Sequence, residues 1–299
     1  MPSPRALLGL YREGKNISAL LREERGLTHN TEEVIEVAYD LQSGSYVESM
    51  KDPAMAEHKR RYAAELAETI RGLGEVESVL EAGVGEATTL AGVLSALGAP
   101  VRAYGFDLSW SRVAVAKRWL ASHGHPCVTL CTGSLRAIPF ATDSVDVVYT
   151  SHSIEPNGGQ EAPILTELTR VAREYLVLWE PSYAHASEAG KRRMEVHGYC
   201  RALPEQAERL GLEVVEHRPL AESANPLNPT AVTVIRTGPS SVPQPSVLAC
   251  PRFETPLQEV GGMLFSPEGL VVYPVLGGIP CLREDNGVLA SRYAEMLGG

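Results

Sequence analysis

The chain has 299 residues, of which 44% are hydrophobic and 21% are charged, a composition that excludes a disordered protein. Its formal net charge of -10 disfavours a broad phosphate-binding surface, so a nucleic-acid partner is not expected. No run approaches the roughly 20 apolar residues that cross a bilayer, and the amino end lacks the apolar core of a secretion signal. We therefore expect a cytoplasmic protein without a membrane partner.

The chain divides into four segments by pattern. Residues 1–72 show helical spacing without strand-like runs, which predicts a helical lid or cap. Residues 73–237 alternate short β-rich runs with helical stretches, which predicts an α/β fold with a mostly parallel sheet covered on both faces. The last two β-rich runs, 212–217 and 231–235, have no helix between them and should form an antiparallel edge.

A linker and a small second unit should follow this domain. Residues 238–246 contain three prolines and several serines, which predicts a linker. Residues 247–299 are β-like and rich in turns, which predicts a small β-rich domain. Units this small normally need a metal or a partner surface for stability.

Two glycines fall where the first strand turns into a helix, in residues 79–89 (VLEAGVGEATT). Ligands of doubly wound folds bind at such turns, and glycine lets a ligand approach the main chain closely. Gly83 and Gly85 alone also fit a tight turn without a ligand. Asp107 ends the second β-rich run and could accept both hydroxyls of a ribose. The alternative role of a helix cap suits Ser109 better, so we expect an adenosine-containing ligand.

The charge pattern at the turn selects among such ligands. A dinucleotide fingerprint has a further small residue where this chain has Thr88, and Glu81 would repel a pyrophosphate. An acid at this position suits a cationic ligand instead. S-adenosylmethionine carries an ammonium and a sulfonium and no phosphate, so we predict it as the cofactor in place of NAD.

Three segments resemble the successive motifs of class I S-adenosylmethionine-dependent methyltransferases: residues 79–89, residues 104–109 (YGFDLS) and residues 138–152 (IPFATDSVDVVYTSH). The branch most similar to them contains the ubiquinone- and menaquinone-biosynthesis enzymes. The resemblance covers about residues 75–237, including Glu180 and Pro181. It implies a Rossmann-like sheet of seven strands and an enzyme that transfers methyl groups.

The resemblance also implies roles for individual residues. Glu81 would lie near the methionine ammonium, Asp107 would hold the ribose hydroxyls, and Leu108 would pack on adenine. Two positions depart from the family pattern, because the third glycine is Ala87 and the acid that contacts the adenine amino group is Ser134. Adenine contact at residue 134 should be weaker or made by main chain. The predicted cofactor-binding residues are Tyr39, Tyr46, Glu81, Gly83, Gly85, Thr88, Asp107, Leu108, Ser134, Leu135, Ser151 and His152.

Methyl transfer to an activated sulfonium carbon requires mainly alignment, with a general base only where the acceptor must lose a proton. The candidate bases are His152, Tyr183 and His197, each of which could instead be a capping or packing residue. Tyr39 and Tyr46 lie in a segment, residues 38–46 (AYDLQSGSY), that resembles the cofactor-closing segment of these enzymes. Their rings could attract the sulfonium by a cation–π interaction of ~1 kcal/mol, or merely pack the lid.

The carboxyl-terminal segment resembles the zinc-ribbon activator subunit of tRNA and protein methyltransferases. A tetrahedral zinc site needs four ligands, and only Cys250 remains, because Phe253, Ser266 and Gly269 stand at the other positions. We therefore expect no metal and a unit that packs against the main domain or a second copy, with a homodimer as one outcome. The five cysteines are scattered, which predicts reduced thiols with Cys281 in the core.

Three functions remain open. The leading one is methyl transfer to a small-molecule acceptor, with oxygen or nitrogen favoured if His152 is the base. The second is methyl transfer to tRNA or protein. The acidic net charge disfavours it, and so does the absence of an Asn-Pro-Pro-Tyr motif, in whose place the chain has residues 151–156 (SHSIEP). A non-catalytic S-adenosylmethionine-binding scaffold is the third.

Overall fold

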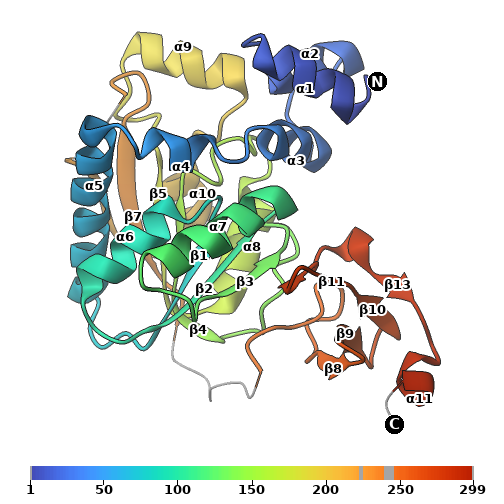
Figure 1. Ribbon diagram of the computed structural model, residues 1–299. Helices are drawn as coiled ribbons and strands as arrows, with labels where there is room; N and C mark the ends of the chain where they lie inside the picture. Colours follow the sequence, from blue (N-terminus) through green and yellow to red (C-terminus); the bar gives the residue numbers. More distant parts are fainter. Residues whose placement is uncertain (1, 222–224, 239–245, 298–299) are drawn as a thin grey trace.

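The computed structural model describes residues 2–221, 225–238 and 246–297. Five helices precede the first strand (Figure 1): α1 (Pro4–Arg12), α2 (Ile17–Arg25), α3 (Glu32–Leu41), α4 (Ser45–Ser49) and α5 (Pro53–Gly72). Helices α1, α2, α3 and α5 each begin at a residue whose side chain accepts a backbone N–H of the first turn, namely Ser3, Asn16, Thr31 and Asp52.

These helices belong to two different packing units. Helices α1, α2 and α3 form a small core of their own around Leu7, Leu21 and Val34. Helix α5 instead packs on the main domain, because Leu66 and Ile70 lie in a core cluster beside the sheet. The segment expected to be a lid therefore contains one helix, α5, that packs on the sheet and three, α1 to α3, that pack with one another, with the short α4 between them (Figure 1).

The central sheet has seven strands in the order β3-β2-β1-β4-β5-β7-β6. Strands β1 to β5 are parallel where they pair, whereas β7 is antiparallel to both β5 and β6, as the missing helix between the last two runs predicts. The Rossmann-like α/β fold is confirmed. The strands are β1 (Ser78–Ala82), β2 (Arg102–Asp107), β3 (Thr129–Thr132), β4 (Val145–Ser151), β5 (Ala172–Pro181), β6 (Glu213–Pro219) and β7 (Thr230–Arg236).

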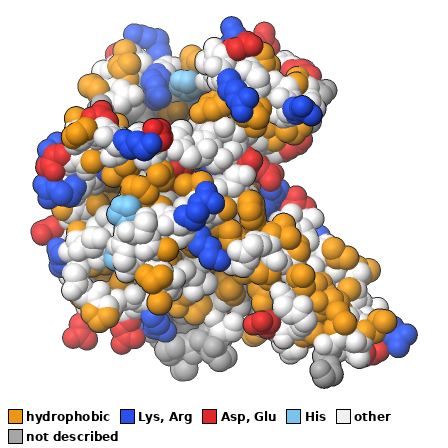
Figure 2. All heavy atoms as spheres, viewed as in Figure 1, with side chains coloured by type: hydrophobic (Ala, Val, Ile, Leu, Met, Phe, Trp, Pro, Cys, Tyr) orange, Lys and Arg blue, Asp and Glu red, His pale blue; other side chains and the backbone are white. Residues whose placement is uncertain are grey.

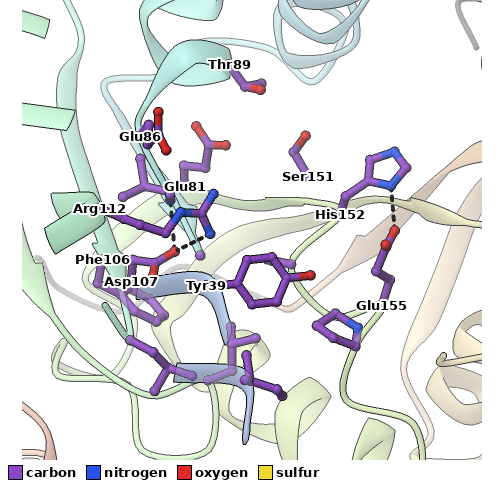
Figure 3. Close-up of a pocket in the computed structure, with 18 of the residues that line it drawn as sticks. Tyr39, Glu81, Glu86, Thr89, Phe106, Asp107, Arg112, Ser151, His152 and Glu155 are labelled. Carbon is purple, nitrogen blue, oxygen red and sulfur yellow. Dashed lines mark hydrogen bonds and ion pairs between the residues drawn. The ribbon is translucent and has the colours of Figure 1, made fainter. Parts of the chain in front are cut away.

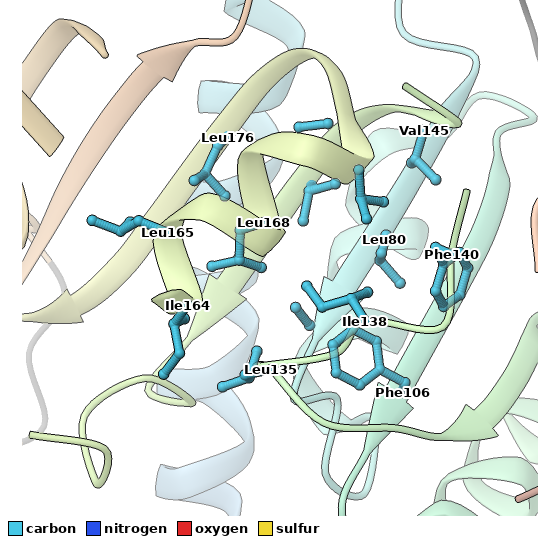
Figure 4. Packing of buried hydrophobic residues seen from close by; sticks show 14 of the residues in the cluster. Leu80, Phe106, Leu135, Ile138, Phe140, Val145, Ile164, Leu165, Leu168 and Leu176 are labelled. Carbon is cyan, nitrogen blue, oxygen red and sulfur yellow. The ribbon is translucent and has the colours of Figure 1, made fainter. Parts of the chain in front are cut away.

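Helices cover both faces of this sheet because neighbouring residues of its strands alternate between two apolar cores. On β1, Val79 joins the cluster formed with α5, α6 (Thr88–Leu97) and α7 (Trp110–Ser122). Its neighbour Leu80 joins the cluster formed with α8 (Glu161–Val171) and α10 (Leu203–Arg209), part of which Figure 4 shows. Helix α9 (Glu188–His197) is not among the helices predicted from the sequence; it begins at the cap residue Ser187.

The carboxyl-terminal unit is β-rich, as expected. A four-stranded sheet of order β13-β10-β9-β8 stands beside a two-stranded pair, β11 (Val275–Leu276) and β12 (Ile279–Pro280). The remaining elements are β8 (Gln258–Val260), β9 (Met263–Ser266), β10 (Val271–Tyr273), η1 (Glu284–Asn286), β13 (Val288–Leu289) and α11 (Tyr293–Leu297). Most of the predicted linker, residues 239–245, lies outside the described residues.

This unit packs on the β3 edge of the main domain. The Leu282 N–H donates to the carbonyl of Thr132 at 3.1 Å, and Tyr273 and Leu282 are fully buried in the same core cluster as Phe140 and Cys131. Its outer surface carries exposed hydrophobic side chains (Figure 2), namely Phe253, Val288, Leu289, Met296 and Leu297. The unit therefore has one apolar face against the domain and a second exposed one.

The cysteines are all free thiols, and Cys250 and Cys281 are buried. Within residues 2–221, 225–238 and 246–297, no cluster of three or more histidine, cysteine, aspartate or glutamate side chains could hold a metal ion. Over the same residues, no helix combines the length and the apolar character that crossing a membrane would require.

Candidate active site

A cavity of about 240 Å³ opens where strands β1, β2 and β4 end, beneath helices α3 and α4. Figure 3 shows Glu81, Arg112 and Asp107 on one side of it and His152 with Glu155 on the other. Eleven of the twelve residues predicted to bind the cofactor line it: Tyr39, Tyr46, Glu81, Gly83, Gly85, Thr88, Asp107, Leu108, Leu135, Ser151 and His152. The twelfth, Ser134, lies behind the wall and bonds to Glu32, which does line the cavity.

The glycine turn has a backbone conformation and close neighbours that favour glycine. Gly83 and Gly85 have φ angles of 77° and 53°, in the left-handed region. A Cβ atom on Gly83 would lie 2.3 Å from the Cβ of Ser153, and one on Gly85 would lie 2.4 Å from Nη2 of Arg112. A side chain at Gly83 is therefore disfavoured by both the backbone and Ser153, whereas at Gly85 the backbone disfavours it and the neighbouring atom is the end of the flexible Arg112 side chain.

Asp107 is oriented by main-chain donors. Its Oδ2 accepts the Gly85 N–H at 2.9 Å and its Oδ1 accepts the Ser109 N–H at 3.0 Å. Ser109 caps helix α7, as predicted, because its hydroxyl accepts the Arg112 N–H at 3.1 Å. The carboxylate thus points from the end of β2 toward the glycine turn.

Arg112 is a site residue that the sequence reasoning missed. Its Nη1 lies 3.7 Å from Oδ2 of Asp107, and its guanidinium carbon lies 5.2 Å and 4.9 Å from the ring centres of Tyr39 and Tyr46. Burial lowers the pKa of Arg112, but Asp107, Tyr46, Tyr39 and Glu86 together outweigh this and raise it. The available signal was its position on the buried face of α7, one turn after the cap residue Ser109.

Glu81 is a buried carboxylate that lacks full compensation. It is 2% exposed and accepts a hydrogen bond from the Tyr149 hydroxyl at 3.1 Å. Burial raises the pKa of Glu81 to about 8, although the Tyr149 hydrogen bond and the charge of Lys59 act in the opposite direction. A further cation beside this carboxyl would favour its ionised form.

Glu86 ties the lid to the glycine turn and was also missed. Its two carboxylate oxygens accept the N–H groups of Gly44 and Val47, each at 2.8 Å. These donors belong to the first turn of α4, which has no capping side chain of its own. The short helix that carries Tyr46 is therefore capped by a residue of the cofactor turn.

The opposite wall is built around His152. Its Nδ1 lies 2.7 Å from Oε2 of Glu155, and its Nε2 lies 2.8 Å from the hydroxyl of Thr230. Burial lowers the pKa of His152, but the hydrogen bond and charge of Glu155 outweigh this and raise it. His152 has a φ angle of 56°, a backbone conformation uncommon for residues other than glycine.

The loop after β4 is shaped by Glu180. Its carboxylate accepts the N–H groups of Ser153, Ile154 and Glu155 at 3.0–3.1 Å, which fixes Glu155 beside His152. Burial raises the pKa of Glu180 to about 7. The resemblance included Glu180 without assigning it a role, and Glu155 was not singled out at all.

The other two candidate bases lie away from the cavity. Tyr183 donates its hydroxyl hydrogen to Glu195 at 2.8 Å and lies near Lys191, outside the cavity wall. His197 ends helix α9 and stacks on Tyr199, with ring centres 5.2 Å apart. In this conformation neither side chain reaches the space between Glu81 and His152.

Residues 79–174 match a family model described as a methyltransferase domain. The chain carries a methyltransferase domain. The match begins with β1 and the glycine turn and ends within β5, so it contains Glu81, Asp107 and His152. No curated protein sequence matches the chain significantly.

Solved structures of methyltransferases resemble the methyltransferase domain at low identity. Magnesium protoporphyrin IX methyltransferase from Synechocystis PCC 6803 is 12% identical, with a TM-score of 0.47 over 60% of this chain and 83% of that chain. A putative sarcosine dimethylglycine methyltransferase from Galdieria sulphuraria is 14% identical, with a TM-score of 0.48 over 62% of this chain and 87% of that chain. The complex between a Haloferax volcanii methyltransferase activator and a putative methyltransferase is 16% identical, with a TM-score of 0.49 over 66% of this chain and 97% of that chain.

Proposed function

We propose that the protein is an S-adenosylmethionine-dependent methyltransferase that acts on an oxygen or nitrogen atom of a small-molecule acceptor, with His152 as the general base. The observation that carries the proposal is that one cavity joins the carboxylates of Glu81 and Asp107 to the His152–Glu155 pair. Ser151 and Tyr39 lie between these two sides (Figure 3). A cofactor held by the two carboxylates would therefore present its sulfonium toward the histidine.

The cofactor side fits S-adenosylmethionine in charge and shape. The undercompensated carboxyl of Glu81 suits the methionine ammonium, and the glycine turn leaves the main chain open to the ligand. Asp107 has lone pairs left for ribose hydroxyls after accepting two N–H bonds. In the ligand-free protein the guanidinium of Arg112 lies over Gly85. Binding of a ribose there requires the Arg112 guanidinium to move aside or to share the Asp107 carboxylate with the ribose hydroxyls.

The opposite side fits a proton acceptor. If Nδ1 of His152 donates to Glu155, then Nε2 carries the free lone pair and accepts from the Thr230 hydroxyl. An acceptor hydroxyl or amine that takes the place of Thr230 on Nε2 would give its proton to this nitrogen. Glu155 would stabilise the resulting imidazolium. The cofactor supplies the methyl group, and the residues of the chain align the two reactants and exclude water.

The lid favours a small acceptor over a macromolecule. Helices α3 and α4 cover the cavity, and α4 is held on the glycine turn by Glu86. The net charge of -10 also disfavours tRNA. Within the same proposal, Tyr39 and Tyr46 would release Arg112 and contact the sulfonium when the cofactor binds.

The carboxyl-terminal unit would stabilise the methyltransferase domain, since it shares a core with the β3 edge and none of its described residues lines the cavity. Its resemblance to a zinc ribbon, its lack of metal and the homodimer stay predictions. A second copy would cover the exposed apolar side chains on its outer face. Size-exclusion chromatography with light scattering of the wild type and a Leu289→Lys variant tests this: a monomer in both contradicts it.

The function is tested by calorimetric titration with S-adenosylmethionine, followed by production of S-adenosylhomocysteine with a panel of small acceptors. We expect cofactor binding in the wild type and in His152→Gln, and turnover in the wild type only. Turnover retained in His152→Gln would contradict the base assignment. Binding without turnover on any acceptor, including tRNA and protein, would favour the scaffold function, and turnover only on tRNA or protein would overturn the small acceptor.

A further inference from the structure

One face of lid helix α3 carries three acids at intervals of four residues, Glu32, Glu36 and Asp40. Each is bonded to a different segment of the molecule, so the helix is docked along its whole length. The partners, in the same order, are Ser134 with Arg136, Arg283 of the carboxyl-terminal unit, and Ser109. Ile35 and Tyr39, on the adjoining face, line the cavity.

The position of Glu32 follows from the order of the strands. Glu81 ends β1, Asp107 ends its neighbour β2, and Ser134 follows β3, the next strand in the sheet. A ligand with its ammonium at Glu81 and its ribose at Asp107 must therefore direct its base toward the end of β3. The cavity at that end is lined by Leu108, Leu135 and Glu32.

The Glu32 carboxylate is held in place and has unused acceptor capacity. The Ser134 hydroxyl donates to its Oε1, and Arg136 donates to its Oε2. A carboxylate has about four lone-pair sites, so each oxygen retains one. Burial raises the pKa of Glu32, but the bonds from Arg136 and Ser134 outweigh this and lower it, which keeps the group ionised at neutral pH.

We propose that Glu32 accepts a hydrogen bond from the exocyclic amino group of the cofactor's adenine, and that lid helix α3 is therefore part of the cofactor site. The inference rests on the proposed orientation of S-adenosylmethionine between Glu81 and Asp107. Ser134 has no carboxylate of its own. Its hydroxyl instead positions the carboxylate of Glu32, which lies 102 residues earlier in the chain. Cofactor binding thereby requires the lid to be docked.

The test compares two ligands by calorimetry: S-adenosylhomocysteine and its 6-deamino analogue, in which hydrogen replaces the amino group. We expect the wild type to prefer the amino form by about 10- to 100-fold, the range for a hydrogen bond to a charged group. In Glu32→Ala this preference should fall below about threefold. The matched control is Glu33→Ala, which removes the same charge from the same helical turn, at an exposed residue that pairs with Arg25; it should keep the preference.

The outcomes separate this inference from the proposed function. Equal affinity of the wild type for both ligands overturns the role of Glu32 while leaving cofactor binding intact. Equal weakening of both ligands in Glu32→Ala shows that the residue acts only by docking α3, and also overturns it. If the alanine variant does not fold, Glu32→Gln serves, with an expected loss of at least about threefold in preference and the same contrary results. Failure of the wild type to bind either ligand contradicts the proposed function itself.

Discussion

The buried carboxyl of Glu81 makes cofactor binding dependent on pH. Burial raises its pKa to about 8 in the ligand-free protein, so at pH 7 roughly one molecule in ten has it ionised. The cofactor ammonium requires the ionised form. Binding at pH 7 should therefore release about 0.9 proton, and affinity should fall up to about tenfold for each pH unit below 8. At higher pH the ligand's own α-amino group loses its charge, so affinity should decline again.

The assay is calorimetric titration with S-adenosylhomocysteine at pH 7 in buffers of different ionisation enthalpy, because the slope of the observed enthalpy counts released protons. Glu81→Gln should release none and bind about 10- to 100-fold more weakly at pH 8, since it loses a charge-assisted hydrogen bond. Glu77→Gln is the matched control: this exposed carboxylate lies just before β1, and the variant should behave as the wild type. Wild-type enthalpies that do not vary with buffer, together with unchanged affinity in Glu81→Gln, would refute the reasoning.

Three further predictions concern the same site. Between pH 4.5 and 8 the folded state keeps a proton on Glu81 that the unfolded state releases, so the free energy of unfolding of the ligand-free protein should fall with rising pH, by at most about 4–5 kcal/mol. Urea unfolding at pH 5 and at pH 8 should show a smaller fall in the Glu81→Gln variant than in the wild type, and an equal fall would contradict this. Gly83→Ala should destabilise the protein by about 1–3 kcal/mol, because its Cβ would meet Ser153 at 2.3 Å and its φ is positive; thermal unfolding checks it, with exposed Gly14→Ala as the strained but unobstructed control. His152→Gln should lower kcat about 10²- to 10⁴-fold, with less than about threefold change in cofactor affinity. The wild-type kcat should rise with pH through a pKa above 6.5, because only a neutral histidine accepts a proton, and a kcat that does not change with pH would argue against His152 as the base.

Much of the fold and the cofactor side of the site could be predicted because their signals are local in the chain. Short β-rich runs such as residues 78–82, alternating with helical stretches, predict strands of a sheet covered on both faces, and the absence of a helix between the last two runs predicts their antiparallel pairing. The turn with Gly83, Gly85 and Glu81 lies within five residues, so its chemistry could be interpreted before any tertiary structure was known. Asp107 required only the rule that parallel strands end at the same edge.

What remained hidden depends on side chains that approach from elsewhere. Arg112 lies on the buried face of α7, but its sequence position does not say that Asp107, Tyr39 and Tyr46 meet it there. Glu155 lies beside His152 because Glu180 accepts its N–H, a contact between residues 25 positions apart. Glu32 and Ser134 are 102 residues apart, and only the docking of α3 over the end of β3 brings them together. The sequence by itself determined the individual strands and helices of the domain and a turn suited to a cationic adenosyl ligand. The tertiary structure alone decided which distant carboxylates and cations face it, because the direction of a side chain follows from the packing of its whole element.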